Sequence, residues 1–274
     1  MWNKFVKKTK ASKVPINLAI VGKYFDSGDF VLSDVYISVL EAIKYSAYEV
    51  GRKPKIVCIN SKDFESGKLK VSVLSQFDGV IVPGGFGEKG VEGIIMAIRF
   101  ARENKIPYLG LCYGMQLAVI EYARSVAKWK DAHTTEVNPN TKHPVIDVMH
   151  DQKNLLETSN LGGTMRLGSY PAKLLNGSIA RKAYGKDEIT ERHRHRYEVN
   201  PSFVPDLEKQ GLVFSGKSPD RSLCEIVELP ESIHPHFVAT QFHPEFKARP
   251  LSPHPLFTAF MKVAKKRGDS HKTK

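Results

Sequence analysis

The chain has 274 residues, of which 41% are hydrophobic and 26% charged, and its formal net charge is +12 at pH 7. This composition is typical of a globular protein, and the length suits one large α/β domain with a packed core. No apolar run reaches the roughly 18 residues of a transmembrane helix, and the basic N-terminus lacks the apolar stretch of a secretory signal. We therefore expect a cytoplasmic protein that does not associate with membranes.

Most of the positive charge lies in the two terminal segments. Five lysines precede Val14, and six basic residues follow Met261 with one acidic residue, so the termini account for all but about +2 of the charge. This distribution does not resemble a basic face for nucleic acid, and we expect no nucleic-acid partner. Three cysteines without regular spacing argue against a disulfide framework, so their thiols are expected to be reduced.

Apolar runs of strand length alternate with segments of helical periodicity in the first half of the chain. Strands are expected at 16–21, 55–59, 79–82 and 108–111, and helical faces at 35–47, beginning with Val35, and at 94–101. This alternation favours βαβ units and a mostly parallel sheet. The fold class predicted is α/β, with a doubly wound, mostly parallel sheet and helices on both faces.

The helical rhythm is lost beyond about residue 127, where turn residues become frequent. Short apolar runs at 212–214, 224–229 and 237–240 predict an antiparallel extension of the sheet. Ser252 and Pro253 can open a last helix that carries Leu256, Phe260 and Val263 before a Lys-rich end. We expect a basic tail or linker at 1–15, one domain at 16–267 and a basic C-terminal tail at 268–274.

The segment GLCYG at 110–114 lies between an apolar strand and a helical segment, which is the pattern of a nucleophile elbow. Gly110 and Gly114 permit a turn so tight that larger side chains would clash, and the turn exposes the thiol of Cys112. The following helix N-terminus favours the reactive thiolate. Cys58 and Cys224 lie in apolar surroundings and fit buried core cysteines.

A base and an orienting carboxylate are expected at His243 and Glu245, directly after the strand-like run 237–240. In extended backbone, alternate residues share a face, so His243 could meet Cys112 while Glu245 steadies the imidazole. Such a His-x-Glu pair is unspecific by itself and gains meaning from the elbow.

The glycine-rich segment PGGFG at 83–87 follows its own strand and can bring backbone amides close to a substrate. We expect the amides of Gly85 and Tyr113 to form an oxyanion hole, since in elbow enzymes the residue after the nucleophile usually supplies one donor. The segment has neither a complete dinucleotide-binding fingerprint nor a Walker ending.

The elbow, the Pro-Gly-Gly loop and the His-Pro-Glu sequence, in this order, resemble the class I glutamine amidotransferases. Three further stretches are similar to the glutaminase part of the CTP synthase family: GGTMRLG at 162–168, RHRHRYEVN at 192–200, and TTE at 134–136 followed by HPV at 143–145. The resemblance extends over roughly residues 16 to 260.

This resemblance implies a triad of Cys112, His243 and Glu245 that hydrolyses L-glutamine to glutamate and ammonia. It also implies which residues hold the substrate, with charged side chains for its α-amino and α-carboxylate groups; they are Gly85, Tyr113, Gly114, Met115, Gln116, Glu136 and Arg196. No cofactor or metal is expected in this chain. In the complete enzyme, the resemblance implies that ATP and Mg²⁺ drive amination of UTP to CTP.

The implied partner is a synthetase domain that binds ATP and UTP, in cis or in trans, and a homo-oligomer is expected only together with it. Tyr113 stands where the family usually has leucine, which leaves its backbone role unchanged. Glu88 and Lys89 stand near the family's GTP-activator site, where an aromatic or aliphatic residue and then arginine are commoner. A GTP activator is therefore retained only as a possible partner.

Two alternatives belong to other functional classes. A γ-glutamyl hydrolase or cysteine peptidase could share the elbow and the histidine, but would have no evident need for Glu136 together with Arg196. A non-catalytic binding module could use a metal site built from two His-x-His pairs at 193–195 and 234–236. Such pairs without a fixed third ligand are unspecific.

Overall fold

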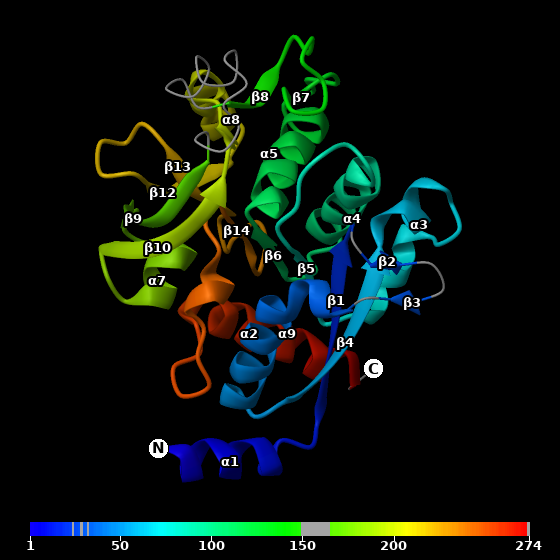
Figure 1. Ribbon diagram of the computed structural model, residues 1–274, viewed down its shortest axis with the longest axis vertical. Coiled ribbons are helices and arrows are strands. Elements are labelled where there is room, and N and C mark those ends of the chain that lie inside the picture. The colour runs from blue at the N-terminus through cyan, green and yellow to red at the C-terminus, as the bar shows by residue number, and fades with distance from the viewer. Residues whose placement is uncertain (24, 28–29, 32, 149–164, 273–274) are drawn as a thin grey trace.

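The computed structural model describes residues 1–23, 25–27, 30–31, 33–148 and 165–272, and its centre is a nine-stranded sheet (Figure 1). Five neighbouring strands are parallel, and they are, in order across the sheet, β4 (Lys53–Asn60), β1 (Pro15–Gly22), β5 (Gly79–Val82), β6 (Tyr108–Leu111) and β14 (Phe237–Thr240). Four antiparallel strands continue from β14: β13 (Cys224–Leu229), β12 (Val213–Lys217), β9 (Arg166–Leu174) and β10 (Glu188–His195). The predicted parallel sheet with an antiparallel extension is confirmed.

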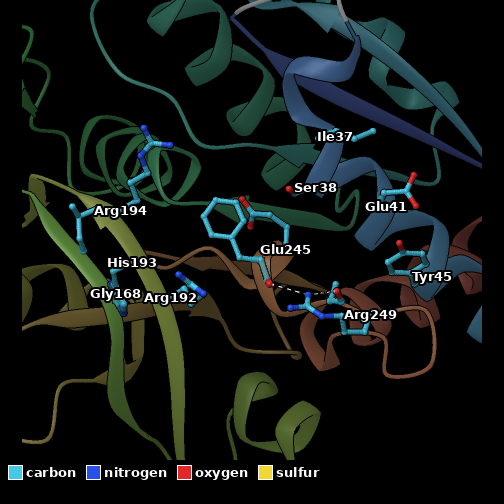
Figure 2. Close-up of a pocket in the computed structure, with 13 residues that line it drawn as sticks. Ile37, Ser38, Glu41, Tyr45, Gly168, Arg192, His193, Arg194, Glu245 and Arg249 are labelled. Atoms are coloured by element: carbon cyan, nitrogen blue, oxygen red, sulfur yellow. Dashed lines mark hydrogen bonds between the residues drawn. The ribbon is translucent and has the colours of Figure 1, made fainter.

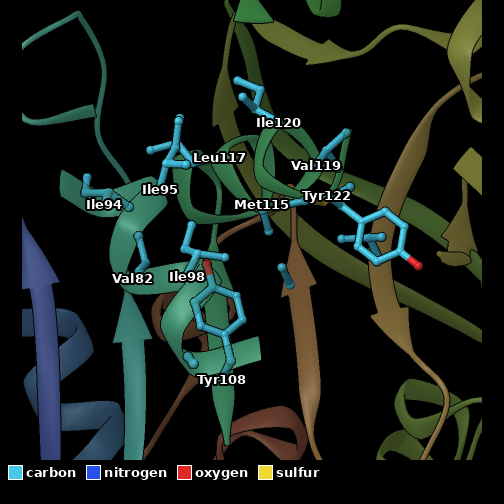
Figure 3. Packing of buried hydrophobic residues seen from close by; sticks show 14 of the residues in the cluster. Val82, Ile94, Ile95, Ile98, Tyr108, Met115, Leu117, Val119, Ile120 and Tyr122 are labelled. Atoms are coloured by element: carbon cyan, nitrogen blue, oxygen red, sulfur yellow. The ribbon is translucent and has the colours of Figure 1, made fainter. Parts of the chain in front are cut away.

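Helices cover both faces of the parallel half. On one face, α2 (Ile37–Glu49) and α9 (Pro255–Lys272) bury their apolar sides against β1, β5 and β6. On the other face, α4 (Val91–Glu103) and α5 (Tyr113–Ser125) pack over the same strands (Figure 3). Each side chain from Leu18 to Val21 of β1 therefore meets one or the other helical layer, which is why this stretch is continuously apolar. The doubly wound arrangement expected from the sequence is confirmed.

Shorter elements complete the fold. The helices and turns are η1 (Ser33–Tyr36), α3 (Ser61–Glu65), η2 (Val71–Gln76), α7 (Ile179–Tyr184), η5 (Pro201–Phe203), α8 (Val204–Lys209) and η6 (Pro244–Lys247). The short strands are β2 (Asp26–Ser27), β3 (Phe30–Val31), β7 (His133–Thr134), β8 (Pro144–Val148) and β11 (Tyr197–Val199). Within the described ranges, no helix combines the length and apolarity needed to cross a bilayer.

The structure differs from the sequence-based expectations at several boundaries. Val35 lies in η1 and is 45% exposed, so the buried face of the helix begins later, at Val39. The last helix starts at Pro255 and continues to Lys272, through the Lys-rich end that was expected to be a tail. The first three residues of the GGTMRLG segment, 162–164, lie outside the described residues.

The basic N-terminal segment, expected to be a tail, contains the helix α1 (Trp2–Ala11), which lies beside α2. The Phe5 ring contacts the Tyr45 ring with centroids 6.4 Å apart, and Lys8 forms an ion pair of 2.6 Å with Glu49. Both partners of the ion pair are substantially exposed, so it adds little stability. The domain limits drawn from the sequence remain a prediction.

Candidate active site

Cys112 occupies the sharp turn between β6 and α5, with φ 51° and ψ −97°. The flanking glycines are required there, because a β-carbon on Gly114 would lie 2.4 Å from the Val82 carbonyl oxygen. A β-carbon on Gly110 would lie 2.7 Å from the Tyr108 hydroxyl. The strained backbone of Cys112 and the lack of space for a side chain at Gly110 and Gly114 support the predicted nucleophile elbow.

The backbone of the neighbouring strand β14 brings His243 to Cys112. Leu111 pairs with Thr240 in the parallel ladder, and the Cys112 amide donates to the Thr240 carbonyl at 2.6 Å. The side chain of Gln241 donates towards the Cys112 sulfur at 3.8 Å. Both chain segments therefore leave the same end of the sheet at adjacent positions, where parallel α/β sheets place their ligands.

His243 and Glu245 form the expected pair, with 2.7 Å between Nδ1 and Oε1. The two side chains do not meet because they share one face of extended backbone, as expected from the sequence. Glu245 lies in the 3₁₀ turn η6, and this turn brings the two side chains together. The turn brings the carboxylate to Nδ1 of the ring, and Phe246 stacks on His243 with centroids 4.8 Å apart. Hydrogen bonding and stacking together fix the plane of the imidazole.

The electrostatic surroundings favour the protonated form of His243. Burial alone lowers its pKa, but the Glu245 carboxylate and then Cys112 raise it, and the resulting pKa lies well above the ordinary value. Nε2 is buried without a hydrogen-bond partner among the described residues. A protonated imidazole beside Cys112 is suited to pair with a thiolate nucleophile.

Gly84 is a site residue that sequence analysis missed in favour of its neighbour Gly85. A β-carbon on Gly84 would lie 2.8 Å from Cε1 of His243 and 3.7 Å from Cβ of Cys112. The PGG segment was a signal for close backbone approach, but which glycine meets the histidine depends on tertiary packing.

A cavity of about 710 Å³ opens in front of Cys112 and contains most of the predicted substrate residues. Its lining includes the triad and the four predicted residues Gly85, Gln116, Glu136 and Arg196. Val35, Ile37 and the 70% exposed Phe86 form apolar parts of the wall. A carboxylate and a guanidinium in one cavity are suited to the two charged groups of an amino acid.

Three other predicted substrate residues, Tyr113, Gly114 and Met115, are not among the residues that line this cavity. Met115 is fully buried in the core over α4, and Gly114 is pressed against Val82. The hydroxyl of Tyr113 donates to the Gly87 carbonyl at 2.8 Å. Any contact of these residues with glutamine is therefore through the backbone.

Gln116 lines the cavity, but its amide nitrogen donates to the Tyr197 carbonyl at 2.8 Å.

Glu136 is connected to the glycine-rich loop, since its Oε1 accepts a hydrogen bond from the Gly87 amide at 3.0 Å. Burial raises the pKa of Glu136, opposed by this hydrogen bond and by the charges of Lys23 and Arg196. Lys23 is a second residue that sequence analysis missed. Its position directly after β1, at the carboxyl end of a parallel strand, is the signal that could have found it.

A buried cluster of charged and polar groups lies beside the cavity. Arg166 donates to Glu225 at 2.8 Å and lies 3.6 Å from Glu198. Burial raises the pKa of Glu198 to about 8, partly opposed by Arg166. His193 and His195 contact each other at 2.9 Å, and burial lowers the pKa of both.

The structure does not gather the two His-x-His pairs into one site. His234 contacts the Ala101 carbonyl, and His236 packs against Phe260, whereas His193 contacts Phe242. Across the part of the chain that is described, no three His, Cys, Asp or Glu side chains are arranged to hold a metal ion. The metal-site alternative therefore has no geometric support in these residues.

A second cavity of about 510 Å³ adjoins the first and shares Glu245 and Phe246 with it. Figure 2 shows Arg192, Arg194 and Arg249 among its lining residues, together with Glu41 and Tyr45 of α2. Arg249 donates to the carbonyls of Phe246 and Ala248 at 3.0 and 2.7 Å, so this guanidinium fixes the segment after the triad.

Comparisons with known proteins agree with this geometry. The profile of the family "Glutamine amidotransferase class-I" matches residues 31–263. CTP synthases from Clostridium kluyveri and Caldanaerobacter subterraneus are 50% and 52% identical over 263 and 262 residues. Each match covers 96% of this chain but 47% of the relative, so the chain spans about half the length of these proteins.

A solved structure, the glutaminase domain of Trypanosoma brucei CTPS with bound acivicin, superposes with a TM-score of 0.83 at 37% identity. The match covers 92% of this chain and 94% of the solved chain. The γ-glutamyl hydrolase, peptidase and binding-module alternatives are not favoured by these relatives. The chain belongs to the class I glutamine amidotransferase family and is homologous to the glutaminase domain of CTP synthases.

Proposed function

We propose that this chain hydrolyses L-glutamine to glutamate and ammonia, with Cys112 as nucleophile, His243 as acid and base, and Glu245 as the group that orients the imidazole. The observation that carries this proposal is the convergence of the strained cysteine and the His–Glu pair on one cavity. Glu136 and Arg196 in the same cavity supply the opposite charges needed for a free amino acid.

In the proposed reaction, the Cys112 thiolate attacks the side-chain carbonyl carbon of glutamine, and the carbonyl oxygen becomes negatively charged. The amides of Gly85 and Tyr113 stabilise this oxyanion. Protonated His243 gives its proton to the departing nitrogen, so ammonia leaves and a γ-glutamyl thioester forms. Neutral His243 then removes a proton from water, which attacks the thioester and releases glutamate and the thiolate.

We further propose that the ammonia serves a synthetase domain, in cis or in trans, that aminates UTP to CTP with ATP and Mg²⁺. The similarity to CTP synthases supports this wider role. We assign ATP and Mg²⁺ to that domain, and an oligomer to the complete enzyme. The GTP response and the cytoplasmic location stay predictions from the sequence.

The first experiment measures glutamate release by the wild-type chain and by Cys112→Ala, with Cys58→Ala and Cys224→Ala as matched controls. Only Cys112→Ala is expected to abolish release. An electrophilic glutamine analogue such as acivicin should add its mass to the peptide that contains Cys112, and excess glutamine should protect that peptide. Activity retained in Cys112→Ala, or labelling of Cys58, would show that the assignment is wrong.

A further inference from the structure

The loop that contains Gly85 is held at its start by the triad and at its end by a buried lysine. Gly84 lies against His243 and Cys112, and Gly85 lines the cavity. Among the described residues, none accepts a backbone hydrogen bond from the Gly85 amide. The carbonyls of the next two residues, Phe86 and Gly87, are directed towards Lys23.

Lys23 contacts this end of the loop through its ammonium group. Nζ donates to the Phe86 carbonyl at 2.8 Å and also to the Gly87 carbonyl, and it lies 4.8 Å from the centroid of the Tyr113 ring. The residue is only 8% exposed. Hydrogen bonds from a charged donor are roughly twice as strong as neutral ones, so these two carbonyls are firmly oriented.

The negatively charged side chain of Glu136 contacts the same end of the loop as Lys23. Its carboxylate accepts from the Gly87 amide, so Lys23 and Glu136 hold the carbonyl and the amide of the same residue. Burial lowers the pKa of Lys23 to about 8, opposed by the charges of Glu136 and Glu65. Gly87 has φ +73°, a conformation that glycine adopts without strain.

We propose that Lys23 is a positioning residue for glutamine hydrolysis, which holds the Phe86 and Gly87 carbonyls so that the Gly85 amide stays directed at the oxyanion. This inference rests on the proposed glutaminase function. Lys23 itself does not line the Cys112 cavity, so its effect on the reaction is exerted through the loop. Oxyanion stabilisation depends on donors that are oriented before charge develops, which is what a fixed loop provides.

The test compares Lys23→Met with Lys62→Met, which removes an exposed lysine of α3 that does not line the Cys112 cavity. Methionine keeps the length of the buried stem but cannot donate to the two carbonyls. We expect kcat for glutamine to fall about 10- to 100-fold in Lys23→Met, with a smaller change in KM. This decrease is smaller than the roughly 1000-fold decrease in kcat that removal of an oxyanion donor can cause, because the Gly85 amide is still present. Lys62→Met should match the wild type.

Two further measurements separate positioning from a general structural role. Alkylation of Cys112 by iodoacetamide forms no oxyanion, so its rate in Lys23→Met should stay within about twofold of the wild type. Lys23→Arg should recover most of the lost kcat, because guanidinium can donate to both carbonyls.

The outcomes distinguish this inference from the proposed function. An unchanged kcat in Lys23→Met would overturn the positioning role, and so would an alkylation rate that falls in parallel with kcat, or a Lys23→Arg variant no better than Lys23→Met. In each case, wild-type activity that disappears in Cys112→Ala would leave the glutaminase proposal standing. A wild-type chain no more active than Cys112→Ala would end both proposals.

Discussion

Gly84 lies against the edge of the His243 ring, at a distance that leaves no room for a side chain. A β-carbon added there would be 2.8 Å from Cε1, and real β-carbons do not approach ring atoms so closely. The ring cannot simply rotate away, because Glu245 holds Nδ1 and Phe246 stacks on its face. The position of the proposed base His243 thus depends on the absence of a side chain at a residue outside the proposed triad.

Gly84→Ala is therefore expected to displace the imidazole and to lower kcat by about 100-fold, the effect of misplacing a catalytic group by about 1 Å. Iodoacetamide alkylation of Cys112 should slow as well, because the imidazolium partner moves. In Lys23→Met, by contrast, the rate of alkylation is expected to stay close to that of the wild type. Kinetics of both reactions on the same preparation check the prediction, and unchanged alkylation would contradict it.

Arg196 and His243 should affect different kinetic constants. Arg196→Ala removes the proposed partner of the substrate carboxylate, which typically costs about 2 to 5 kcal/mol and should appear mainly in KM. His243→Ala should lower kcat with little change in substrate binding. Arg192→Ala is the matched control, since this exposed arginine of β10 does not line the Cys112 cavity. Steady-state kinetics that show equal effects of both changes on KM alone would refute these roles.

The hydroxyl of Tyr113 gives a finer test of the loop. Tyr113→Phe removes only the hydrogen bond to the Gly87 carbonyl, which also accepts from Lys23, so we expect a decrease in kcat of about 2- to 5-fold, corresponding to a net hydrogen bond of about 1 kcal/mol or less. Tyr122→Phe, on the same helix, removes a hydroxyl bonded to the Gln210 carbonyl at 2.7 Å. This control should lose some thermal stability but retain its kcat.

The buried carboxyl of Glu198 should make the stability of the fold depend on pH. Burial raises its pKa from 4.5 to about 8, so between pH 6.5 and 8 the folded state holds a proton that the unfolded state has lost. The free energy of unfolding therefore falls as pH rises, by about 2 kcal/mol over this interval from Glu198 alone. Denaturant unfolding of the wild type and of Glu198→Gln should show a shallower decrease in the variant. Equal slopes would contradict this assignment.

The parallel half of the sheet could be predicted from the sequence because its strands are apolar on both faces. The expected runs at 79–82, 108–111 and 237–240 coincide with the parallel strands β5, β6 and β14, and the run at 224–229 coincides with the antiparallel strand β13. β10 was missed because its buried positions are mostly polar: Glu191, His193 and His195 face inward with Ile189. Hydrophobic periodicity cannot identify a strand whose inward side is a charged network.

The site could be predicted only as far as local sequence determines geometry. The flanking glycines identified Cys112, and the His-x-Glu spacing placed two residues that the structure joins by a hydrogen bond. The end of β1 and the PGG segment indicate that Lys23 and Gly84 lie near the site, but their contacts with segments far away in the chain could not be predicted from sequence. The sequence around a single lysine or glycine does not indicate which distant residues it contacts.

The parallel pairing of β6 with β14 has a consequence for how this family can vary. Leu111 and Thr240 are direct neighbours in the ladder, and the Cys112 amide continues that ladder by one further hydrogen bond. The separation between Cys112 and the segment that carries His243 is thus set by two paired backbones and not by the long connection between the strands. Insertions and deletions in that connection, where β7 to β13 lie, can accumulate without altering this separation.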